Sequence, residues 1–572
     1  MKNNCSACKM LVGDDLTKVF PDGKVSGNAL APAGNGVRLE GARGEVVSFQ
    51  VVLGAPAQNL NSVAVEAEPP RQGERSLPSE VYRIGFVQTH ETKYATPRGP
   101  GWYPDPLFPN EPIELPANEY RVFWINVNIP EDAEGTYQGT VFVRNGVNTL
   151  AAIPLEVRVW KIAIPRQMDI FHAFDFSLAD KVSGFHKLYG RLDGAGWEPF
   201  VRYMRYLESH KINAFFYTHF LWDSGLVDVE QKEGKYACNL ARARKVLDLM
   251  ERLGLAGNLW STPIWYNPKV LFDIYPFIER FRSLGDKVYF DEEFVRFLVE
   301  VCADFWKKLS PAFAKRWFAY VWDEPREPSW HYENMKLLSE RLKQAAPAAR
   351  QLAAIGKTAI IDRTLKENLP IDLIIGHMSG YTEDLMQRMR ESGRQYWWYT
   401  SNWASSFLSF WIDEPAVNHR ALYWLTWRYE VPGFGYWNSN TWNYASYGYH
   451  NVDEQRVLSY PFSNWNVTPN GPCQGTGDGQ LFYPGPDGPI GSLRMEVIRH
   501  GSQDHQLLSE LSRRAAHDPR AREMVARVRS AMGDLVVSCD GSWPLRRYNI
   551  SPAELLRLRN EVGRFLNGNA AG

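Results

Sequence analysis

The sequence predicts an α/β fold in which an antiparallel β-sandwich is followed by a (β/α)8 TIM barrel and then by a helical C-terminal segment. Its 572 residues exceed what one small core needs, so several domains are expected. Strand-like runs and amphipathic stretches alternate eight times between residues 166 and 450, and a barrel of roughly 250 residues before insertions has this pattern. The runs before this span alternate polar with apolar residues, and helical spacing follows it.

Residues 1–165 are predicted to form the N-terminal β-sandwich. Short runs that alternate apolar and polar positions are separated there by Gly, Pro and Asn, which is typical of antiparallel strands. The clearest runs are 45–53, 120–127, 139–144 and 150–159. The stretch 99–107 is rich in aromatic residues and proline and is too long for a hairpin turn, so it either reaches over the next domain or covers its own sandwich.

Residues 166–490 are predicted to form the barrel, and residues 491–572 a helical segment that packs on it or mediates dimerisation. The expected barrel strands are 169–176, 212–219, 257–265, 317–324, 350–356, 372–379, 394–401 and 433–440. The expected barrel helices include 199–210, 240–253, 294–309, 330–345, 382–392 and 415–430. The stretch 451–489 is expected to be a loop, and helices are expected at 493–516, 519–537 and 552–566.

The predicted strand ends carry polar and aromatic side chains. The carboxyl ends of parallel barrel strands meet at one rim, where such folds place their active sites. The residues expected to bind substrate there are His172, Asp175, Tyr217, His219, Trp265, Tyr381, Trp398, Tyr399, Trp437, Asn440 and Trp442. His172 and His219 fit a structural role equally well, and Trp437 or Trp442 could instead fill the barrel interior.

Two adjacent carboxylates stand at the end of the most apolar predicted strand. The run 317–322 leads directly into Asp323 and Glu324, and a proline follows them. Successive side chains of a strand face opposite ways, so this pair can share one site only where the strand breaks up. We predict that both are catalytic; the structural alternative is a salt bridge with Arg316 or Arg326.

The carboxylate pair among aromatic residues indicates cleavage of a glycosidic bond. Such cleavage needs an acid that protonates the leaving oxygen and a negative group that stabilises the oxocarbenium-like centre. An ordinary retaining enzyme takes its nucleophile from another strand end about 5 Å away, and the predicted strand 394–401 ends without a carboxylate. Adjacent Asp and Glu residues suit substrate assistance, in which the 2-acetamido oxygen of the sugar attacks C1. Glu324 is then the general acid/base, and Asp323 orients the acetamido N–H.

The same tripeptide, Asp-Glu-Pro, occurs a second time at residues 413–415. The residues after it have helical spacing, so Asp413 is a natural N-cap with Pro415 in the first turn. The alternative is that Asp413 is a second catalytic or substrate-binding carboxylate on the loop after the seventh strand.

The composition argues against nucleic acid and membrane partners. The net charge is −1 at pH 7, no basic stripe is visible, and no run of 18 apolar residues occurs. Cys5 and Cys8 form a lone C-x-x-C, and no His, Asp, Glu or Cys set has metal-ligand spacing, so we expect no metal and no cofactor. No apolar leader follows Met1, which predicts a cytoplasmic protein unless a leader was trimmed.

Several motifs together resemble the glycoside hydrolase family 123 proteins and the related domain of unknown function 4091. These motifs are 322–325, 412–416, 433–442, 477–485 and 492–496, and the resemblance spans residues 40 to 510. It implies a β-sandwich plus a (β/α)8 barrel and a β-N-acetylgalactosaminidase that uses substrate assistance, with the catalytic pair at Asp323 and Glu324. Residues 501–506 depart from the pattern, because such proteins commonly carry an acidic, tyrosine-containing run there.

Two rival functions remain open. One is a carbohydrate-binding barrel without turnover. The other is a retaining glycosidase that uses Glu324 with Asp413 on a hexoside without an acetamido group. Pairs of aryl glycosides with and without that group separate the two enzymes.

Overall fold

The computed structural model describes most of the chain. The described residues are 8–54, 56–89, 98–176, 196–214, 226–255, 272, 275–325, 330–400, 408–440, 467–468, 471–472, 476–485, 488–533, 536–538, 545–547 and 550–568. Within them, no helix is both long enough and apolar enough to cross a membrane.

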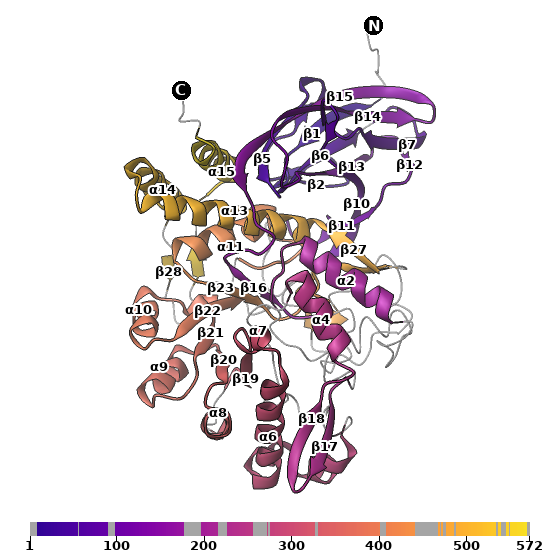
Figure 1. The fold of residues 1–572 in the computed structure, drawn as a ribbon. Helices are drawn as coiled ribbons and strands as arrows, with labels where there is room; N and C mark the ends of the chain where they lie inside the picture. The colour runs from indigo at the N-terminus through magenta and orange to yellow at the C-terminus, as the bar shows by residue number, and fades with distance from the viewer. Residues whose placement is uncertain are drawn as a thin grey trace.

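The N-terminal part consists of two mainly antiparallel β-sheets (Figure 1). The first sheet has the strand order β26 (Tyr483–Gly485), β27 (Gly488–Ser492), β11 (Gly101–Pro109), β10 (Ser79–Thr89), β13 (Tyr120–Asn128), β6 (Val46–Gly54), β1 (Lys9–Gly13) and β4 (Ala31–Pro32). The second has the order β12 (Ile113–Leu115), β7 (Leu60–Ala67), β14 (Gly135–Asn145), β15 (Asn148–Ala163) and β5 (Val37–Arg43), with the short strands β8 (Arg71–Gln72) and β9 (Arg75–Ser76) beside β14. The chain thus returns to the first sheet more than 300 residues after β13.

Strand β6 shows why the two sheets pack face to face. Val47, Phe49 and Val51 project into a core that both sheets share. Ser48 and Gln50 project from the opposite face of β6 and are also buried. Because successive residues of a strand alternate between its faces, a strand covered on both sides needs buried residues at every position.

The central part is a curled sheet of parallel strands. Its order is β16 (Phe171–Phe174), β23 (Gly433–Tyr436), β22 (Gln395–Thr400), β21 (Leu373–His377), β20 (Arg350–Ile355) and β19 (Phe318–Asp323). Six of the eight predicted barrel strands are therefore confirmed. The first of them in the chain pairs with the last, and on its other side Ala173 forms a parallel bridge with Ala214. The predicted strand 257–265 lies outside the described residues, as does most of 212–219.

Alternate residues of these strands face a common interior. One compact cluster takes its members from β16, β19, β20, β21 and β22 and from the segment at Ala214: Phe171, Ala173, Ala214, Phe318, Tyr320, Leu352, Ala354, Leu373, Ile375, Trp397 and Tyr399. Trp397 stacks on Phe171 there, with ring centroids 4.9 Å apart. The residues between them in sequence pack outward against helices, as in a barrel whose interior is filled by side chains.

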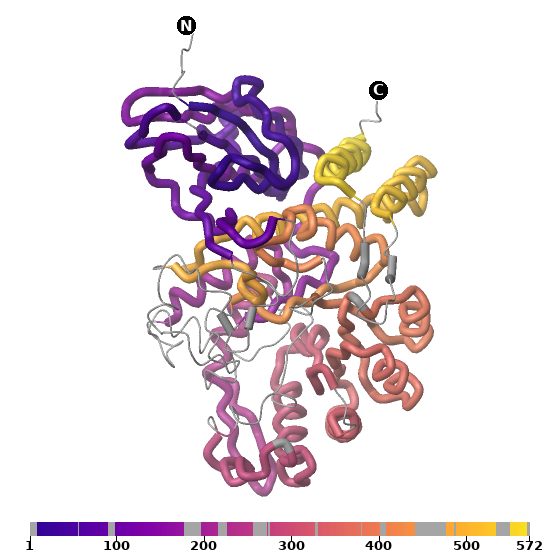
Figure 2. The backbone as a smooth tube through the Cα atoms, turned by 180° about the vertical axis from the view of Figure 1, so that it is seen from behind, coloured from indigo at the N-terminus to yellow at the C-terminus, as the bar shows by residue number. Residues whose placement is uncertain are grey.

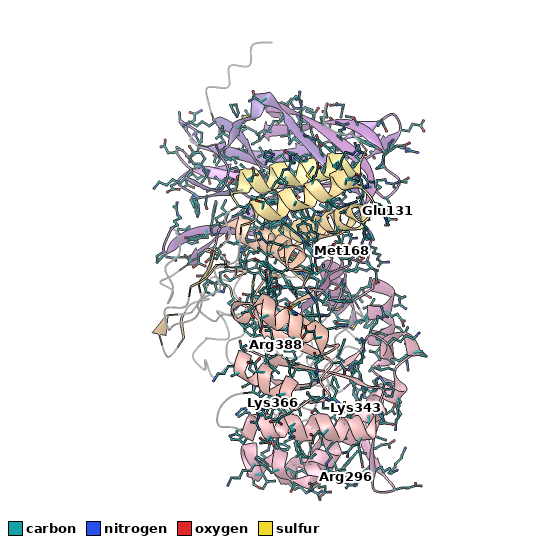
Figure 3. The ribbon with its side chains drawn as sticks, turned by 90° about the vertical axis from the view of Figure 1, so that its left-hand side faces the viewer. Glu131, Met168, Arg296, Lys343, Lys366 and Arg388 are labelled. Atoms are coloured by element: carbon teal, nitrogen blue, oxygen red, sulfur yellow. The ribbon has the colours of Figure 1, made fainter. Side chains whose placement is uncertain are left out.

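Helices cover the outer face of the curled sheet. They are α2 (Trp197–Ser209), α4 (Arg244–Leu253), α6 (Glu292–Lys308), α7 (Pro311–Ala314), α8 (Trp330–Ala345), α9 (Thr358–Lys366), α10 (Glu383–Glu391) and α11 (Ala416–Arg428). In Figure 3 Arg388 of α10 lies above Lys366 of α9 and Lys343 of α8, which are drawn at about the same height, and Arg296 of α6 lies below them. The predicted helices agree within a few residues; α9 and the hairpin of β17 (Asp228–Lys232) and β18 (Lys235–Asn239) were not predicted.

Three C-terminal helices join the two parts of the molecule. They are α13 (Leu493–Ala515), α14 (Pro519–Ala531) and α15 (Pro552–Leu566). Figure 2 shows α13 running between the N-terminal sheets and the central part, with the other two beside it. Gln503 of α13 exchanges two hydrogen bonds of 3.0 Å with the backbone of Val46. On its other side, Asp504 accepts bonds of 2.6 and 2.9 Å from Arg420 of α11.

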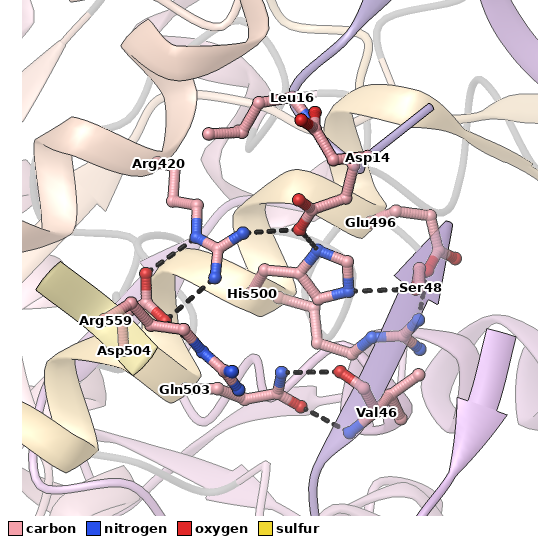
Figure 4. Close-up of polar contacts among 12 residues, drawn as sticks. Asp14, Leu16, Val46, Ser48, Arg420, Glu496, His500, Gln503, Asp504 and Arg559 are labelled. Atoms are coloured by element: carbon pink, nitrogen blue, oxygen red, sulfur yellow. Dashed lines mark hydrogen bonds and ion pairs between the residues drawn. The ribbon is translucent and has the colours of Figure 1, made fainter. Parts of the chain in front are cut away.

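This junction is a buried network of charged and polar side chains (Figure 4). His500 contacts Ser48 at 3.1 Å, and its other ring nitrogen lies 2.6 Å from Asp15. Arg420 also donates to Asp15. Although burial favours the protonated acid, Arg420 and then His500 hold the pKa of Asp15 below its ordinary value. The segment 501–506, which departs from the family pattern, therefore supplies contacts that hold the N-terminal sheet in place.

Four local predictions are wrong. The stretch 99–107 is largely strand β11, because it pairs with β10 and β27 instead of forming a free loop. The expected loop 451–489 includes strands, of which β26 and the start of β27 pair with each other. Helix 519–537 ends at Ala531, and β28 (Val536–Ser538) follows. Helix α11 has Pro415 as its N-cap and no side-chain cap, so Asp413 does not cap it.

Candidate active site

The two candidate catalytic carboxylates lie where β19 loses its regular register. The pairing of β19 with β20 shifts between Tyr320 and Trp322, which inserts Val321 as an extra residue. Val321 and Trp322 both pack in the outer core, whereas Tyr320 belongs to the interior cluster. The bulge resets the alternation, so Asp323 returns to the side of Tyr320, whose hydroxyl donates to Asp323 Oδ1 at 2.7 Å.

Glu324 reaches the same side through an unusual backbone conformation. Its φ is +42°, in the left-handed region that residues other than glycine rarely adopt. Its amide still donates to Ala354 O at 2.9 Å, so the residue stays attached to the sheet. Tyr399, an interior residue of β22, donates its hydroxyl to Glu324 Oε1. A left-handed residue costs about 1–3 kcal/mol and persists where its surroundings enforce it, which is frequent at active sites.

The tyrosine that contacts Glu324 is held in its donor form. Tyr399 is buried, and burial, followed by the negative charge of Glu324, raises its pKa well above the ordinary value. The His377 ring, at the end of β21, meets the Tyr399 ring edge-on with centroids 5.1 Å apart. Sequence analysis did not select Tyr320 or His377 for the site. His377 was detectable as a polar residue near a predicted strand end, whereas the role of Tyr320 depends on the bulge.

Other predicted rim residues lie in the layer between the sheet and its helices. His172 is buried, contacts the hydroxyl of Tyr423 in α11, and has its pKa lowered to about 3 by burial. Trp398 donates to Thr426 Oγ1 at 3.1 Å, and its ring packs edge-on against Tyr381 at 5.3 Å. These contacts connect β16 and β22 to helix α11 and to Tyr381. They do not bring His172, Tyr381 or Trp398 together with Glu324.

The residues after β23 form a second group at the same edge of the sheet. Trp437 is partly exposed and donates its indole N–H to Asp478 Oδ2 at 2.8 Å. Asn440 is buried and forms a backbone bridge with Gln480. Asp175 is also buried, and its carbonyl accepts a bond of 2.6 Å from Ser439 Oγ. Asp478 was not predicted as a site residue, although it lies in the motif 477–485.

Asp413 lies in an environment of its own. It is 4% exposed and accepts a bond of 3.1 Å from Thr476. Burial raises its pKa, which Lys18 and Arg494 partly oppose. Lys18, in β2 (Lys18–Val19), donates to the carbonyls of Ile412 at 2.7 Å and of Glu414 at 2.6 Å. The loop that carries Asp413 is thus attached to the N-terminal part of the chain.

Four predicted substrate-binding residues, Tyr217, His219, Trp265 and Trp442, lie outside the described residues. Where side chains are described, no three His, Cys, Asp or Glu residues are grouped so that they could hold a metal ion.

Comparison with known families identifies this arrangement. Residues 198–511 match the catalytic domain of glycoside hydrolase family 123, and residues 29–145 match the N-terminal domain of that family. The chain belongs to glycoside hydrolase family 123. Family 123 membership makes the protein a glycosidase, and its substrate a carbohydrate. No curated protein matches the chain.

One solved structure supports the family 123 fold. A family 123 glycoside hydrolase from Clostridium perfringens, studied for the details of glycolipid glycan hydrolysis, superimposes with a TM-score of 0.70 over 98% of each chain at 12% identity. A family 39 glycoside hydrolase from Bacteroides cellulosilyticus covers 81% of each chain with a TM-score of 0.38 and 11% identity. At such identities, the first likeness establishes the shared fold.

Proposed function

We propose that this family 123 protein releases a terminal β-linked N-acetylhexosamine, N-acetylgalactosamine in the first instance, by a retaining, substrate-assisted mechanism. The observation that carries the proposal is the convergence of Asp323 and Glu324. The bulge in β19 and the left-handed backbone of Glu324 turn two neighbouring carboxylates to one side of the strand, next to the interior tyrosines. In a regular strand, consecutive side chains point to opposite faces, so the carboxyl groups of Asp323 and Glu324 would lie on different sides of the sheet.

The two carboxylates have different tasks in this mechanism. Glu324 donates its proton to the glycosidic oxygen as the bond to C1 breaks, and the acetamido carbonyl oxygen of the sugar forms a bond to C1. Asp323 accepts a hydrogen bond from the acetamido N–H and stabilises the positive charge of the cyclic intermediate. Water then attacks C1 and the bond between C1 and the acetamido oxygen breaks, while Glu324 takes a proton from the water, which restores the acid and retains the configuration.

We also propose that the curled sheet closes into a complete (β/α)8 barrel. The pairing of the first strand with the last and the parallel bridge at Ala214 support closure, because they give β16 a neighbour on each side. The interior cluster supports it as well, since residues of six chain segments surround one common centre. The remaining strands would come from 212–219 and 257–265.

The alternative mechanism with Asp413 as nucleophile has less support. That mechanism requires the nucleophile within about 5 Å of the acid. Asp413 is buried with Thr476 as its hydrogen-bond partner, and the charges that act on it come from Lys18 and Arg494. We therefore favour the acetamido group of the substrate as the nucleophile.

The decisive experiment compares aryl β-glycosides with and without the 2-acetamido group. We expect hydrolysis of the N-acetylhexosaminide only, and cleavage of the plain hexoside at a comparable rate would rule out substrate assistance. For poor leaving groups, Glu324→Gln should lower kcat by about 10²- to 10⁴-fold, the usual contribution of a general acid. An unchanged rate would remove Glu324 from the mechanism.

The second Asp-Glu-Pro tripeptide provides matched controls. Glu414→Gln should leave kcat within about threefold of wild type, because a residue outside the reacting atoms has little effect on the barrier. Loss of activity in Asp413→Asn, together with cleavage of the plain hexoside, would instead support the mechanism with two carboxylates from different strands.

A further inference from the structure

Gly356 directly follows β20 and lies beside Glu324 and its tyrosine partner. A Cβ atom at this position would lie 3.4 Å from the hydroxyl oxygen of Tyr399 and 4.0 Å from Glu324 Oε1. Strand pairing places it there, because the amide of Glu324 donates to the carbonyl of Ala354, two residues before Gly356. Residues 351–355 are buried, whereas Gly356 is partly exposed, so β20 reaches the surface of the molecule at this point.

Position 356 continues the interior face of β20. Leu352 and Ala354 belong to the interior cluster, whereas Ile355 packs in the outer core. Because side chains alternate along a strand, a side chain at position 356 would point to the interior side, in agreement with its distance from Glu324. The interior residues of β20 thus become smaller toward the carboxyl edge of the sheet, from leucine through alanine to glycine.

Neither the backbone nor the packing of the described residues requires glycine at this position. The φ angle of Gly356 lies outside the left-handed region that favours glycine. Among the described residues, no atom would lie closer than 3.4 Å to its Cβ, which is an ordinary van der Waals contact. Gly376 of β21 differs, because its Cβ would lie 2.1 Å from the hydroxyl oxygen of Tyr396. Alanine at a compatible position usually stabilises a protein by restricting the unfolded chain, so glycine at position 356 is not explained by stability.

We propose that Gly356 is a specificity-determining residue, whose missing side chain leaves room beside Glu324 for the leaving group of the substrate. The inference rests on the proposed function, in which Glu324 protonates the oxygen that joins the sugar to its leaving group. A Cβ 4.0 Å from the Glu324 carboxyl group would stand next to the bond that is cleaved. Asp323 has no atom within 4 Å of this Cβ position, so a side chain there would crowd the leaving group and not the acetamido group.

The test compares two N-acetyl-β-hexosaminides that differ in the size of the leaving group, a methyl glycoside and a disaccharide. Both leaving groups are alcohols that need the proton of Glu324, so a damaged acid would slow both reactions. Gly356→Ala should lower kcat/KM for the disaccharide about tenfold more than kcat/KM for the methyl glycoside, since one carbon atom in a fitted site changes kcat/KM by about 10- to 200-fold. Gly356→Val adds two further carbon atoms and should enlarge this difference.

Gly380 provides a matched control at the same edge of the sheet. It ends the short helix η4 (Met378–Gly380), which follows β21, and it is also partly exposed. Its Cβ would lie 3.6 Å from Thr358 Oγ1 and 3.8 Å from the carbonyl oxygen of Gly356, and no atom of Glu324 lies within 4 Å of it. Gly380→Ala should therefore leave the ratio of the two kcat/KM values within about twofold of wild type. Melting temperatures, which should not fall in either alanine variant, show that both fold.

The outcomes separate this inference from the proposed function. An unchanged ratio in folded Gly356→Ala and Gly356→Val would overturn the inference, even if wild type cleaves both substrates as proposed. An equal decrease for both substrates would overturn it too, because a filled leaving-group site obstructs the larger group more than the smaller one. If wild type cleaves only hexosides without the acetamido group, the proposed mechanism fails, and the methyl glycoside and disaccharide of that hexose test Gly356 in the same way.

Discussion

The hydrogen bond between Tyr399 and Glu324 gives a prediction about the pH profile. Tyr399→Phe removes one hydroxyl from the interior cluster and leaves the ring in place. That hydroxyl is buried and donates to Glu324 Oε1, so it stabilises the ionised carboxylate more than the protonated acid. A hydrogen bond to a charged group contributes about 1.5–3 kcal/mol and one to a neutral group about 0.5–1.5 kcal/mol, so the difference is about 1–1.5 kcal/mol, or about one pH unit at 1.36 kcal/mol per unit.

The assay is the pH dependence of kcat/KM for an aryl N-acetyl-β-hexosaminide. Its alkaline limb reports loss of the proton from the general acid. In Tyr399→Phe this limb should move upward by about one pH unit. Tyr320→Phe removes the donor to Asp323, which has to be ionised, so the acid limb should move upward instead. The two substitutions thus affect opposite sides of the profile.

Tyr396→Phe is the matched control for this prediction. Tyr396 is a buried tyrosine of the same strand, but it faces the outer core. Its loss should leave both limbs where they are in wild type. If Tyr399→Phe folds with wild-type stability and its alkaline limb does not move, the assignment of Glu324 as the general acid beside Tyr399 is refuted.

Three further predictions concern the stability of the fold. Arg494→Met should lower the free energy of unfolding by about 3–5 kcal/mol, because it removes the buried guanidinium that pairs with the buried Asp105 carboxyl and leaves that carboxyl with the hydroxyl of Tyr483. Gly563→Ala should destabilise the protein although alanine favours helices, since its Cβ would lie 2.0 Å from the Trp160 ring. Burial lowers the pKa of His505 to about 4, so the unfolded state takes up a proton first. From this histidine alone, the free energy of unfolding should fall by about 2 kcal/mol between about pH 7 and pH 5, and buried His172, whose pKa is also lowered, adds to the same trend.

Chemical denaturation checks these values against matched variants. Arg388→Met removes a partly exposed arginine that pairs with Asp362 and Asp384, and it should cost less than about 1 kcal/mol. An equal loss from both arginine variants would contradict the argument from burial. Gly34→Ala should be tolerated, since its Cβ would meet no atom within 4 Å. His505→Gln should reduce the pH dependence without abolishing it, because His172 still contributes, and a slope identical to that of wild type would disprove the role of His505.

The local patterns of the chain predicted much of the fold. The spacing of apolar residues gave α8 and α15 with their observed bounds and located six parallel strands within a few residues. Strand β11 was missed because its prolines and aromatic residues are typical of a loop. It is a strand because it pairs along most of its length with β10, and β27, whose residues lie far away in sequence, pairs with its other edge at Pro106 and Leu107.

The candidate site could be predicted only in part. Asp323 and Glu324 were selected because charges at the end of an apolar strand are unusual. Trp398 was expected at the rim, but Trp397 is the residue in the interior, and Trp398 packs against α11. A strand buried on both faces shows no polar side in its sequence, so periodicity cannot tell which face points inward.

By itself, the sequence determined most of the elements, their order and the neighbouring carboxylates, because these follow from local spacing and from residue chemistry. Only the tertiary structure decided the direction of the side chains. A one-residue bulge and one left-handed residue depend on the strands that pair with β19, and they turn Asp323 and Glu324 toward the same side. The hydrogen bond from Trp437 to Asp478 has the same origin, since packing brings together segments that are about 40 residues apart in the chain.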